Sequence, residues 1–307
     1  MQISPGVNLG IGGIPMAIDK LQDKIRKLKN PSVVDFSVEL AAIPPHILAV
    51  EQSPVLAYEH FAKSLLEALK GIVPAVRFSM SQFSLMGAEG LILLQRLTAC
   101  AKEYDYYILL DGPDALSPQN AEMAADMLFG EACRYYFDGL VLSSYLGSDV
   151  LKPYIKRIKE AKKDVFVILR TANKSAAELQ DLLTGSRLVH MAAADIVNRL
   201  ADPLVSRSGY SQVAAVGPAS VADILKKLRA RYQHLFLLVD GYDYSNANAK
   251  NCSFAFDKLG HGAIVCSGRG ILAAWNTDES DGTRYVEQAV EAAERMKKNL
   301  LRYITIL

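Results

Sequence analysis

Cysteine is scarce and scattered in this sequence. Four cysteines occur among 307 residues, and none belongs to a CxxC pair. This spacing argues against a zinc site and against a disulfide framework, and it is typical of a reduced cytoplasmic protein. None of the five histidines stands at metal-ligand spacing to another, so we expect neither a metal nor a cofactor.

Long hydrophobic runs and an excess of one charge are also absent. No apolar run reaches the roughly 18 residues that a membrane helix needs. Gly10, Gly12, Gly13 and Pro15 interrupt the first 15 residues, which therefore do not resemble a signal peptide. The 34 basic residues balance 33 acidic ones. Because a net charge of +1 creates no field over the whole molecule, we expect no nucleic-acid partner and no membrane partner.

Short apolar runs instead alternate with segments of helical periodicity. The runs are Val33–Val38, Ala75–Met80, Tyr106–Asp111, Gly139–Ser144, Asp164–Thr171, Gln212–Gly217, Leu235–Asp240 and Gly262–Ser267. A helix-like segment follows each run, and only the seventh of these segments is short. Eight strand–helix units predict a closed (β/α)8 TIM barrel; a doubly wound open sheet is the alternative, because it uses the same repeating unit.

The chain is predicted to form one domain over residues 1–307. No linker rich in proline, glycine or serine divides it. Residues 1–19 are expected to form an N-terminal arm. Residues 283–304 carry apolar side chains at helical spacing and are expected to form a final packed helix.

Polar and charged residues gather in the loops that follow the predicted strands. In such barrels the site lies at the carboxyl ends of the strands, where these loops converge. Asp111 ends the third predicted strand, where it serves either in an active site or only as a cap for the loop. Gly268 and Gly270 flank Arg269, which suits a phosphate nest, although a structural turn is the alternative.

Five segments resemble the bacterial orotidine 5'-phosphate decarboxylases, in that family's order, across roughly residues 18–275. They are Lys29–Leu48, Ile72–Phe83, Tyr145–Ile155, Gly209–Gly217 and Gly262–Ile271. The resemblance implies a TIM barrel that dimerises across the barrel mouths and binds a small, nucleotide-like ligand.

The chain departs from the family at the residues that perform its chemistry. The family's site alternates two lysines with two aspartates, and one lysine protonates the ring carbon as carbon dioxide leaves. Position by position, the resemblance places Arg77 where one lysine stands and Asp111 as a remnant of the array. Pro113 replaces the proton-donating lysine, and Leu116 replaces the second aspartate. An apolar Leu116 suits a buried contact in a homodimer.

The loops that match the family's ligand-binding loops are altered as well. Ser37 stands where the family has an aspartate that contacts ribose. The family's Thr-Ser-Asn is here a Thr-Ala-Asn sequence that keeps Thr171 and Asn173. The loop after the seventh strand gains Asp240 and Asp243. We expect these five residues to line the ligand pocket.

The phosphate-binding signals point in two directions. The resemblance assigns phosphate binding to Arg269, Gly268 and Gly241, because a guanidinium and backbone amides match a phosphate group. Asp240 and Asp243 add negative charge beside them. We expect one of the two aspartates to pair with Arg269 and to occupy the place of the anion.

Two functions remain open from the sequence. Pro113 has no ionisable group, and the neighbouring Asp114 is an anion where a cation is needed. Arg77 has too high a pKa to donate a proton at neutral pH. The first hypothesis is therefore a non-catalytic binding or regulatory homologue. The alternative is a weak or altered lyase, including residual decarboxylation in pyrimidine biosynthesis, that would use Asp111, Asp114, Asp240, Asp243 and Arg77.

Overall fold

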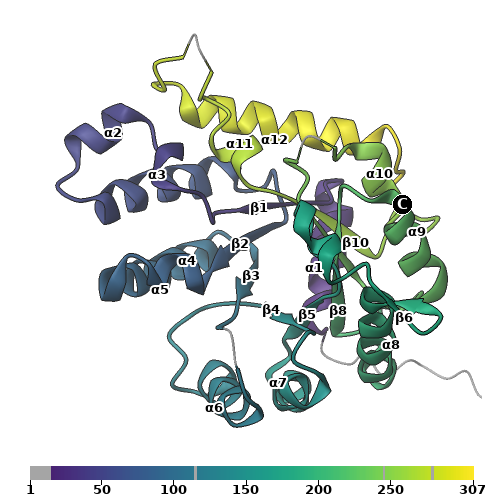
Figure 1. Cartoon of the computed structure of the whole chain (residues 1–307). Helices are drawn as coiled ribbons and strands as arrows, with labels where there is room; N and C mark the ends of the chain where they lie inside the picture. The colour runs from purple at the N-terminus through teal and green to yellow at the C-terminus, as the bar shows by residue number, and fades with distance from the viewer. Residues whose placement is uncertain (1–14, 114–115, 245, 278–279) are drawn as a thin grey trace, which may run out of the picture.

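Eight parallel strands close into a barrel (Figure 1). The computed structural model describes residues 15–113, 116–244, 246–277 and 280–307. Around the barrel the strands are β1 (Ser32–Asp35), β2 (Ala75–Ser79), β3 (Tyr107–Asp111), β4 (Gly139–Ser143), β5 (Asp164–Ile168), β8 (Val213–Pro218), β9 (Leu237–Asp240) and β10 (Ala263–Ser267), which pairs with β1. The prediction of a single-domain TIM barrel is confirmed, and the open sheet is excluded.

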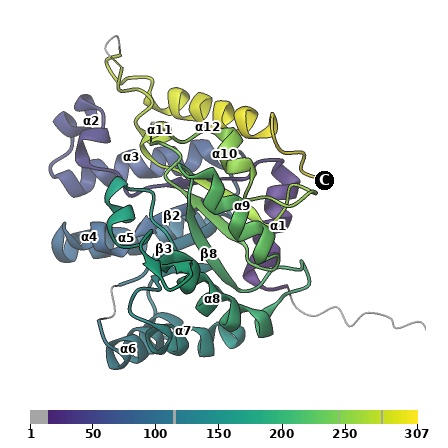
Figure 2. The same cartoon turned by 45° about the vertical axis from the view of Figure 1, so that its right-hand side comes forward.

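Helices surround the barrel and connect consecutive strands. The α-helices are α1 (Ala17–Leu28), α2 (Pro45–Val50), α3 (Pro54–Leu69), α4 (Met80–Ser84), α5 (Gly87–Glu103), α6 (Pro118–Phe129), α7 (Ser148–Ala161), α8 (Val189–Ala201), α9 (Ala222–Arg231), α10 (Ala249–Ser253), α11 (Arg269–Leu272) and α12 (Tyr285–Leu301). The described residues also form three short 3-10 helices, which are η1 (Leu40–Ala42), η2 (Lys174–Glu178) and η3 (Asp202–Leu204). Helix α12 lies within the predicted final helix of residues 283–304, and it packs against α3, α10 and α11 (Figure 2). Within the described residues, no helix is long and apolar enough to cross a membrane.

Local sequence explains where two of the outer helices begin. Ser53 precedes α3 and Ser117 precedes α6, and in both cases a proline occupies the first turn. Each serine hydroxyl oxygen accepts a hydrogen bond from a backbone N–H three residues later, at 3.2 Å in both. A serine cap followed by proline is a strong signal for the start of a helix. The serine oxygen accepts a hydrogen bond from a first-turn N–H, and proline has no N–H that would need a partner.

Helix α1 lies at the amino-terminal ends of the strands. The Gln22 side chain accepts a hydrogen bond from the backbone of Gly262, which directly precedes β10. The helix begins at Ala17, so the predicted arm over residues 1–19 is too long by three residues. Ala17, Ile18 and Asp19 are helical and buried. Residues 1–14 lie outside the described part of the chain.

Aromatic side chains fill the interior of the barrel. Tyr107 on β3 contacts the ring of Phe166 on β5, and Phe166 contacts Phe236 beside β9. Since these strands are not neighbours in the sheet, the rings must meet inside the barrel. Gly139 leaves room for them, because a Cβ there would lie 2.7 Å from the Tyr107 hydroxyl. The barrel is therefore a packed core, and the polar residues of a site are left to its mouth.

The segment after β5 differs from the prediction. The fifth strand ends at Ile168, three residues before the predicted Thr171. A two-stranded hairpin of β6 (Leu183–Thr184) and β7 (Arg187–Leu188) precedes α8. These strands are two residues long and mostly exposed, so they carry no apolar alternation that sequence reasoning could detect.

Candidate functional site

Arg77 lies at the centre of a cluster of charged residues in the barrel mouth. It occupies the third position of β2, and its side chain is only 9% exposed. Its Nε and Nη2 atoms each donate a hydrogen bond to one carboxylate oxygen of Asp111, both at 2.8 Å. Its Nη1 atom donates to Asp240 Oδ1 at 3.1 Å. The paired contact with Asp111 is the fork geometry that matches a guanidinium to a carboxylate.

Asp35 is the third carboxylate of this cluster. Its Oδ2 atom lies 3.6 Å from Arg77 Nη1, and its Oδ1 atom accepts a hydrogen bond from the Ser37 N–H at 2.8 Å. Burial raises the pKa of Asp35 to about 6; Arg77 opposes this rise and Asp111 adds to it. Cys266 also contacts the guanidinium, with Sγ 3.8 Å from Arg77 Nη1, and burial raises the pKa of its thiol.

Barrel geometry explains why these charges meet. Asp35, Asp111 and Asp240 are the last residues of β1, β3 and β9. The carboxyl ends of all barrel strands converge on one mouth, so three strand-end carboxylates surround one guanidinium. Although burial lowers the pKa of Arg77, the carboxylates raise it well above its ordinary value. Arg77 is therefore a permanent cation that these carboxylates hold in place.

Asp243 occupies the backbone turn that was expected to bind phosphate. Its Oδ2 atom accepts a hydrogen bond from the Gly268 N–H at 2.8 Å, and its Oδ1 atom accepts one from the Ser267 hydroxyl at 2.5 Å. Arg269 pairs with Glu39, and its side chain is 61% exposed. The expected pairing of Arg269 with Asp240 or Asp243 is wrong. The carboxylate that occupies this turn is that of Asp243, and backbone and hydroxyl donors hold it.

Two glycines of the expected phosphate site have steric explanations. Gly241 adopts a φ of +83°, and a Cβ there would lie 2.4 Å from the Ala172 side chain. Glycine is therefore required where the loop after β9 approaches the loop after β5. A Cβ on Gly268 would lie 2.9 Å from the Asp35 carbonyl oxygen. Neither observation tests whether these residues also bind an anion.

Thr171 and Asn173 bond to one another in the loop after β5. The Thr171 hydroxyl donates to Asn173 Oδ1 at 2.6 Å, and the Thr171 N–H donates to Gln180 Oε1 at 2.8 Å. Both side chains thus support the loop itself, and their assignment to a ligand pocket stays a prediction. Asp114 lies outside the described residues.

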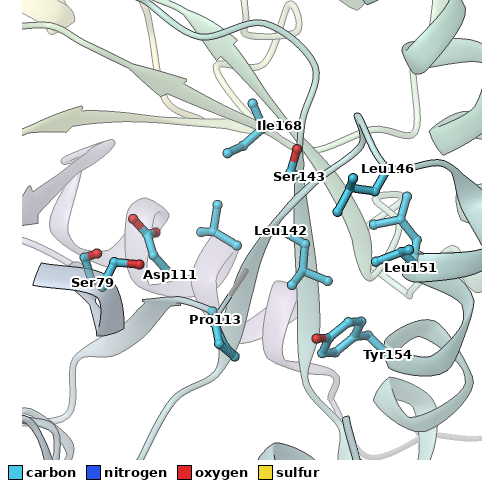
Figure 3. A pocket seen from close by; sticks show the side chains of 13 residues that line it. Ser79, Asp111, Pro113, Leu142, Ser143, Leu146, Leu151, Tyr154 and Ile168 are labelled. Carbon is cyan, nitrogen blue, oxygen red and sulfur yellow. The ribbon is translucent and has the colours of Figure 1, made fainter. Parts of the chain in front are cut away.

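A cavity of about 160 Å³ opens beside this cluster, at the ends of β3 and β4 (Figure 3). Asp111 and Ser79 stand at one side of it, and Tyr154 stands at the other. Pro113 lines the wall between them. The position where the resemblance expects a proton-donating lysine therefore presents only a pyrrolidine ring.

Sequence reasoning missed several residues of this site. Asp35 and Cys266 contact Arg77, and Glu39 pairs with Arg269. A usable signal existed for Asp35, because an aspartate ends β1, β3 and β9 alike, each time directly after apolar residues. Tyr154 lies in α7, and nothing in the sequence distinguishes it from an ordinary core tyrosine.

Comparisons with known proteins agree with this architecture. No family model matches the chain. It is 27% identical over 288 residues to the orotidine 5'-phosphate decarboxylase of Petrotoga mobilis, covering 93% of this chain and 98% of that one. It is 29% identical over 233 residues to the Rhodopirellula baltica protein of the same name, and the match covers 75% of this chain and 77% of that protein.

A solved structure gives the same result for the fold. The Leishmania donovani OMP decarboxylase superposes with a TM-score of 0.68 at 23% identity, over 92% of this chain and 99% of that one. The curated relatives confirm the resemblance drawn from the five segments: this chain is similar over most of its length to bacterial proteins named orotidine 5'-phosphate decarboxylase.

Proposed function

We propose that this chain is an orotidine 5'-phosphate decarboxylase-like barrel that does not decarboxylate and acts as a binding or regulatory protein. The observation that carries the proposal is Pro113, which lines the cavity where a proton donor is required. Loss of a general acid alone costs about 10²–10⁴-fold in rate. Among the described residues, no lysine lines this cavity to take its place.

The remaining charges also oppose the chemistry. Decarboxylation of an anionic substrate builds negative charge on the ring, and a catalyst must stabilise it with preorganised positive charge. Arg77 is the cation of the mouth cluster, and its N–H groups already donate to Asp111 and Asp240. Three carboxylates around one guanidinium leave a net charge of about −2 when all are ionised. This balance disfavours an anionic substrate.

The turn at Ser267 and Gly268 is already occupied by Asp243, and we therefore propose that the chain binds nucleotides only weakly. Asp243 holds the Gly268 N–H and the Ser267 hydroxyl that a phosphate would otherwise use. Two unit charges about 4 Å apart repel by roughly 4 kcal/mol at an effective dielectric near 20. A phosphate dianion would have to displace Asp243 and then remain close to it.

We also propose a homodimer whose interface includes the loops after β3 and β4, and the cytoplasm as its location. Leu116 is 76% exposed in the single chain, and Met123 and Met127 on the adjacent α6 are exposed as well. Neighbouring exposed apolar side chains of this size favour burial against a partner. A second copy of the chain is the partner that the resemblance implies.

A weak or altered lyase is the second candidate. The observation that favours it is Asp35, because a carboxyl group that titrates at about 6 in a barrel mouth suits general acid–base chemistry. Such an activity would show a rate inflection near pH 6 that Asp35→Asn removes.

Release of carbon dioxide from orotidine 5'-phosphate tests the proposal directly. The purified chain is compared with an intact homologue, such as the Petrotoga mobilis protein, under identical conditions. We expect release at background level, and no growth of a uracil-requiring strain that carries this gene. Turnover comparable to that of the homologue would overturn the proposal.

A further inference from the structure

A second cavity lies at the opposite end of the barrel from the charged mouth cluster. Its lining residues come from α1, from the last turn of α5 and from the segments that lead into β3, β4 and β5. Because the barrel strands are parallel, these segments meet at the amino-terminal ends of the strands. The cavity has a volume of about 410 Å³, which is in the usual range for sites that bind small molecules.

Positive charge predominates in this cavity. Four lysines and two aspartates line it: Lys20, Lys24, Lys102, Lys163, Asp105 and Asp138. Lys24 Nζ lies 2.5 Å from Asp105 Oδ2. Within the part of the chain that the structure describes, the other three lysines form no ion pair. Since the whole chain carries a net charge of only +1, an excess of two positive charges in one cavity is a local concentration of charge.

Aromatic rings position two of these ammonium groups. Lys102 Nζ lies 4.0 Å from the ring centroid of Tyr136, and Lys163 Nζ lies 3.7 Å from that of Phe137. Lys163 also donates a hydrogen bond to the Phe137 carbonyl oxygen. A ring face and a carbonyl oxygen attract an ammonium group but carry no net charge, so they orient it without neutralising it. Both positive charges therefore remain available to an anion.

Lys163 supplies a second observation that points to a ligand. Its side chain is partly buried and borders the cavity. Burial lowers the pKa of Lys163; Asp138 opposes this effect and Lys102 adds to it. Asp138 is engaged elsewhere, because its Oδ2 atom accepts a hydrogen bond from the Ile108 N–H at 2.9 Å. A partly buried cation without an ion-pair partner is costly, and a bound anion would offset that cost.

We propose that this cavity binds a phosphate monoester of a small molecule. A phosphate dianion matches the excess of two positive charges, and lysine ammonium groups bind phosphate as point charges. Aromatic side chains provide an apolar surface for the organic part of the ligand: Tyr106, Tyr107, Tyr136 and Phe137. The inference goes beyond the proposed function, and it does not depend on the loss of decarboxylation, because this site and the mouth lie at opposite ends of the barrel.

Three probes of different charge test the inference. Phenyl phosphate is a dianion at about pH 8. Benzoate has the same ring and one charge, and succinate has two charges on separate groups. Each is titrated into the full chain by calorimetry at constant ionic strength, because salt screens exposed charges. We expect saturable binding of phenyl phosphate with a dissociation constant on the order of 1 mM, and binding of benzoate and succinate about tenfold weaker.

Two lysine variants on one helix locate the binding site. Lys20→Gln removes a charge from the rim of the cavity and should weaken phenyl phosphate binding about three- to tenfold. Lys27→Gln is the matched control, because Lys27 is an exposed residue of the same helix that does not line the cavity. It changes the net charge equally and should leave the affinity unchanged. Both variants should keep the wild-type melting temperature in the absence of ligand.

An aspartate variant tests the same electrostatics in the opposite direction. The Asp105 side chain is 91% exposed, and its removal as a charge frees Lys24. Asp105 adopts a φ of +61°, a conformation that asparagine also tolerates. Asp105→Asn should therefore fold normally and tighten phenyl phosphate binding about three- to tenfold.

Several results would overturn the inference. They are heats that do not saturate, tighter binding of benzoate or succinate, equal effects of Lys20→Gln and Lys27→Gln, or no gain of affinity in Asp105→Asn. Failure of the proposed function is read separately. Carbon dioxide release by the wild-type chain would overturn the non-catalytic role alone, whereas absence of saturable phenyl phosphate binding would overturn this inference alone.

Discussion

Asp35→Asn tests the electrostatics of the barrel mouth with a minimal change of shape. The asparagine amide oxygen can still accept the hydrogen bond from the Ser37 N–H, but the buried negative charge is removed. The pKa of Asp35 is about 6 in the folded chain, against an ordinary value of 3.8. Between these two pH values the folded state retains a proton that the unfolded state has released. Stability contributed by this group is therefore fully present below about pH 4 and is lost as pH rises through 6.

The magnitude follows from the size of the pKa difference. A rise of about two pKa units corresponds to roughly 3 kcal/mol of stability lost at neutral pH, since one unit is about 1.4 kcal/mol. The pKa already includes the opposing attraction of Arg77 at 3.6 Å. Because the amide keeps only part of the hydrogen bonding, we expect Asp35→Asn to raise the free energy of unfolding at pH 7.5 by about 1–3 kcal/mol.

Urea unfolding at pH 4.0, 5.0, 6.0 and 7.5 measures this difference. The advantage of Asp35→Asn over wild type should be small at pH 4.0 and should grow to its full size above pH 6. Asp223→Asn is the control, because Asp223 is a surface residue with a 79% exposed side chain. Its substitution should have little effect at any pH. A variant that is less stable than wild type at pH 7.5, or a gain that does not change with pH, would refute the reasoning.

Four further predictions concern the mouth and the interface. Arg77→Met leaves the mouth carboxylates without their cation and should cost about 3–5 kcal/mol of stability, visible as a lower urea midpoint. Pro113→Lys should not restore carbon dioxide release, because residues that act as a unit are not additive; recovered turnover would contradict this. Calorimetry with uridine monophosphate should show no micromolar binding to wild type, and Asp243→Ala should gain affinity because the nest is freed. Light scattering at micromolar concentration should give a dimer, and Leu116→Asp should shift it toward monomer; a wild-type monomer would count against the interface.

The strands were predictable because each buried strand is a short apolar run between polar segments. All eight predicted runs coincide with strands of the barrel to within a few residues at each end. The start of α1 was missed because glycines and Pro15 hide a helix that begins at Ala17. Its stability comes from packing across the strand ends, which a local pattern does not contain.

Sequence predicted which residues reach the mouth better than it predicted their partners. Asp111, Asp240 and Arg77 do meet there, because strand ends converge. The partner of Arg269 was wrong, since this side chain lies on the outer rim, within reach of Glu39 after β1. Partner choice depends on the direction of each side chain and on distances across the barrel. Neither quantity can be read from spacing along one chain.

Asp243 has a consequence for any anion that approaches its loop. The carboxylate is attached to the protein only a few residues after the end of β9, so it competes from within the molecule for the Gly268 N–H. A tethered competitor acts at an effective concentration that is millimolar for short flexible tethers. The apparent dissociation constant of a free phosphate ligand is multiplied by the ratio of that concentration to the competitor's own dissociation constant. A free anion therefore has to outcompete a carboxylate that the chain itself keeps beside the Gly268 N–H.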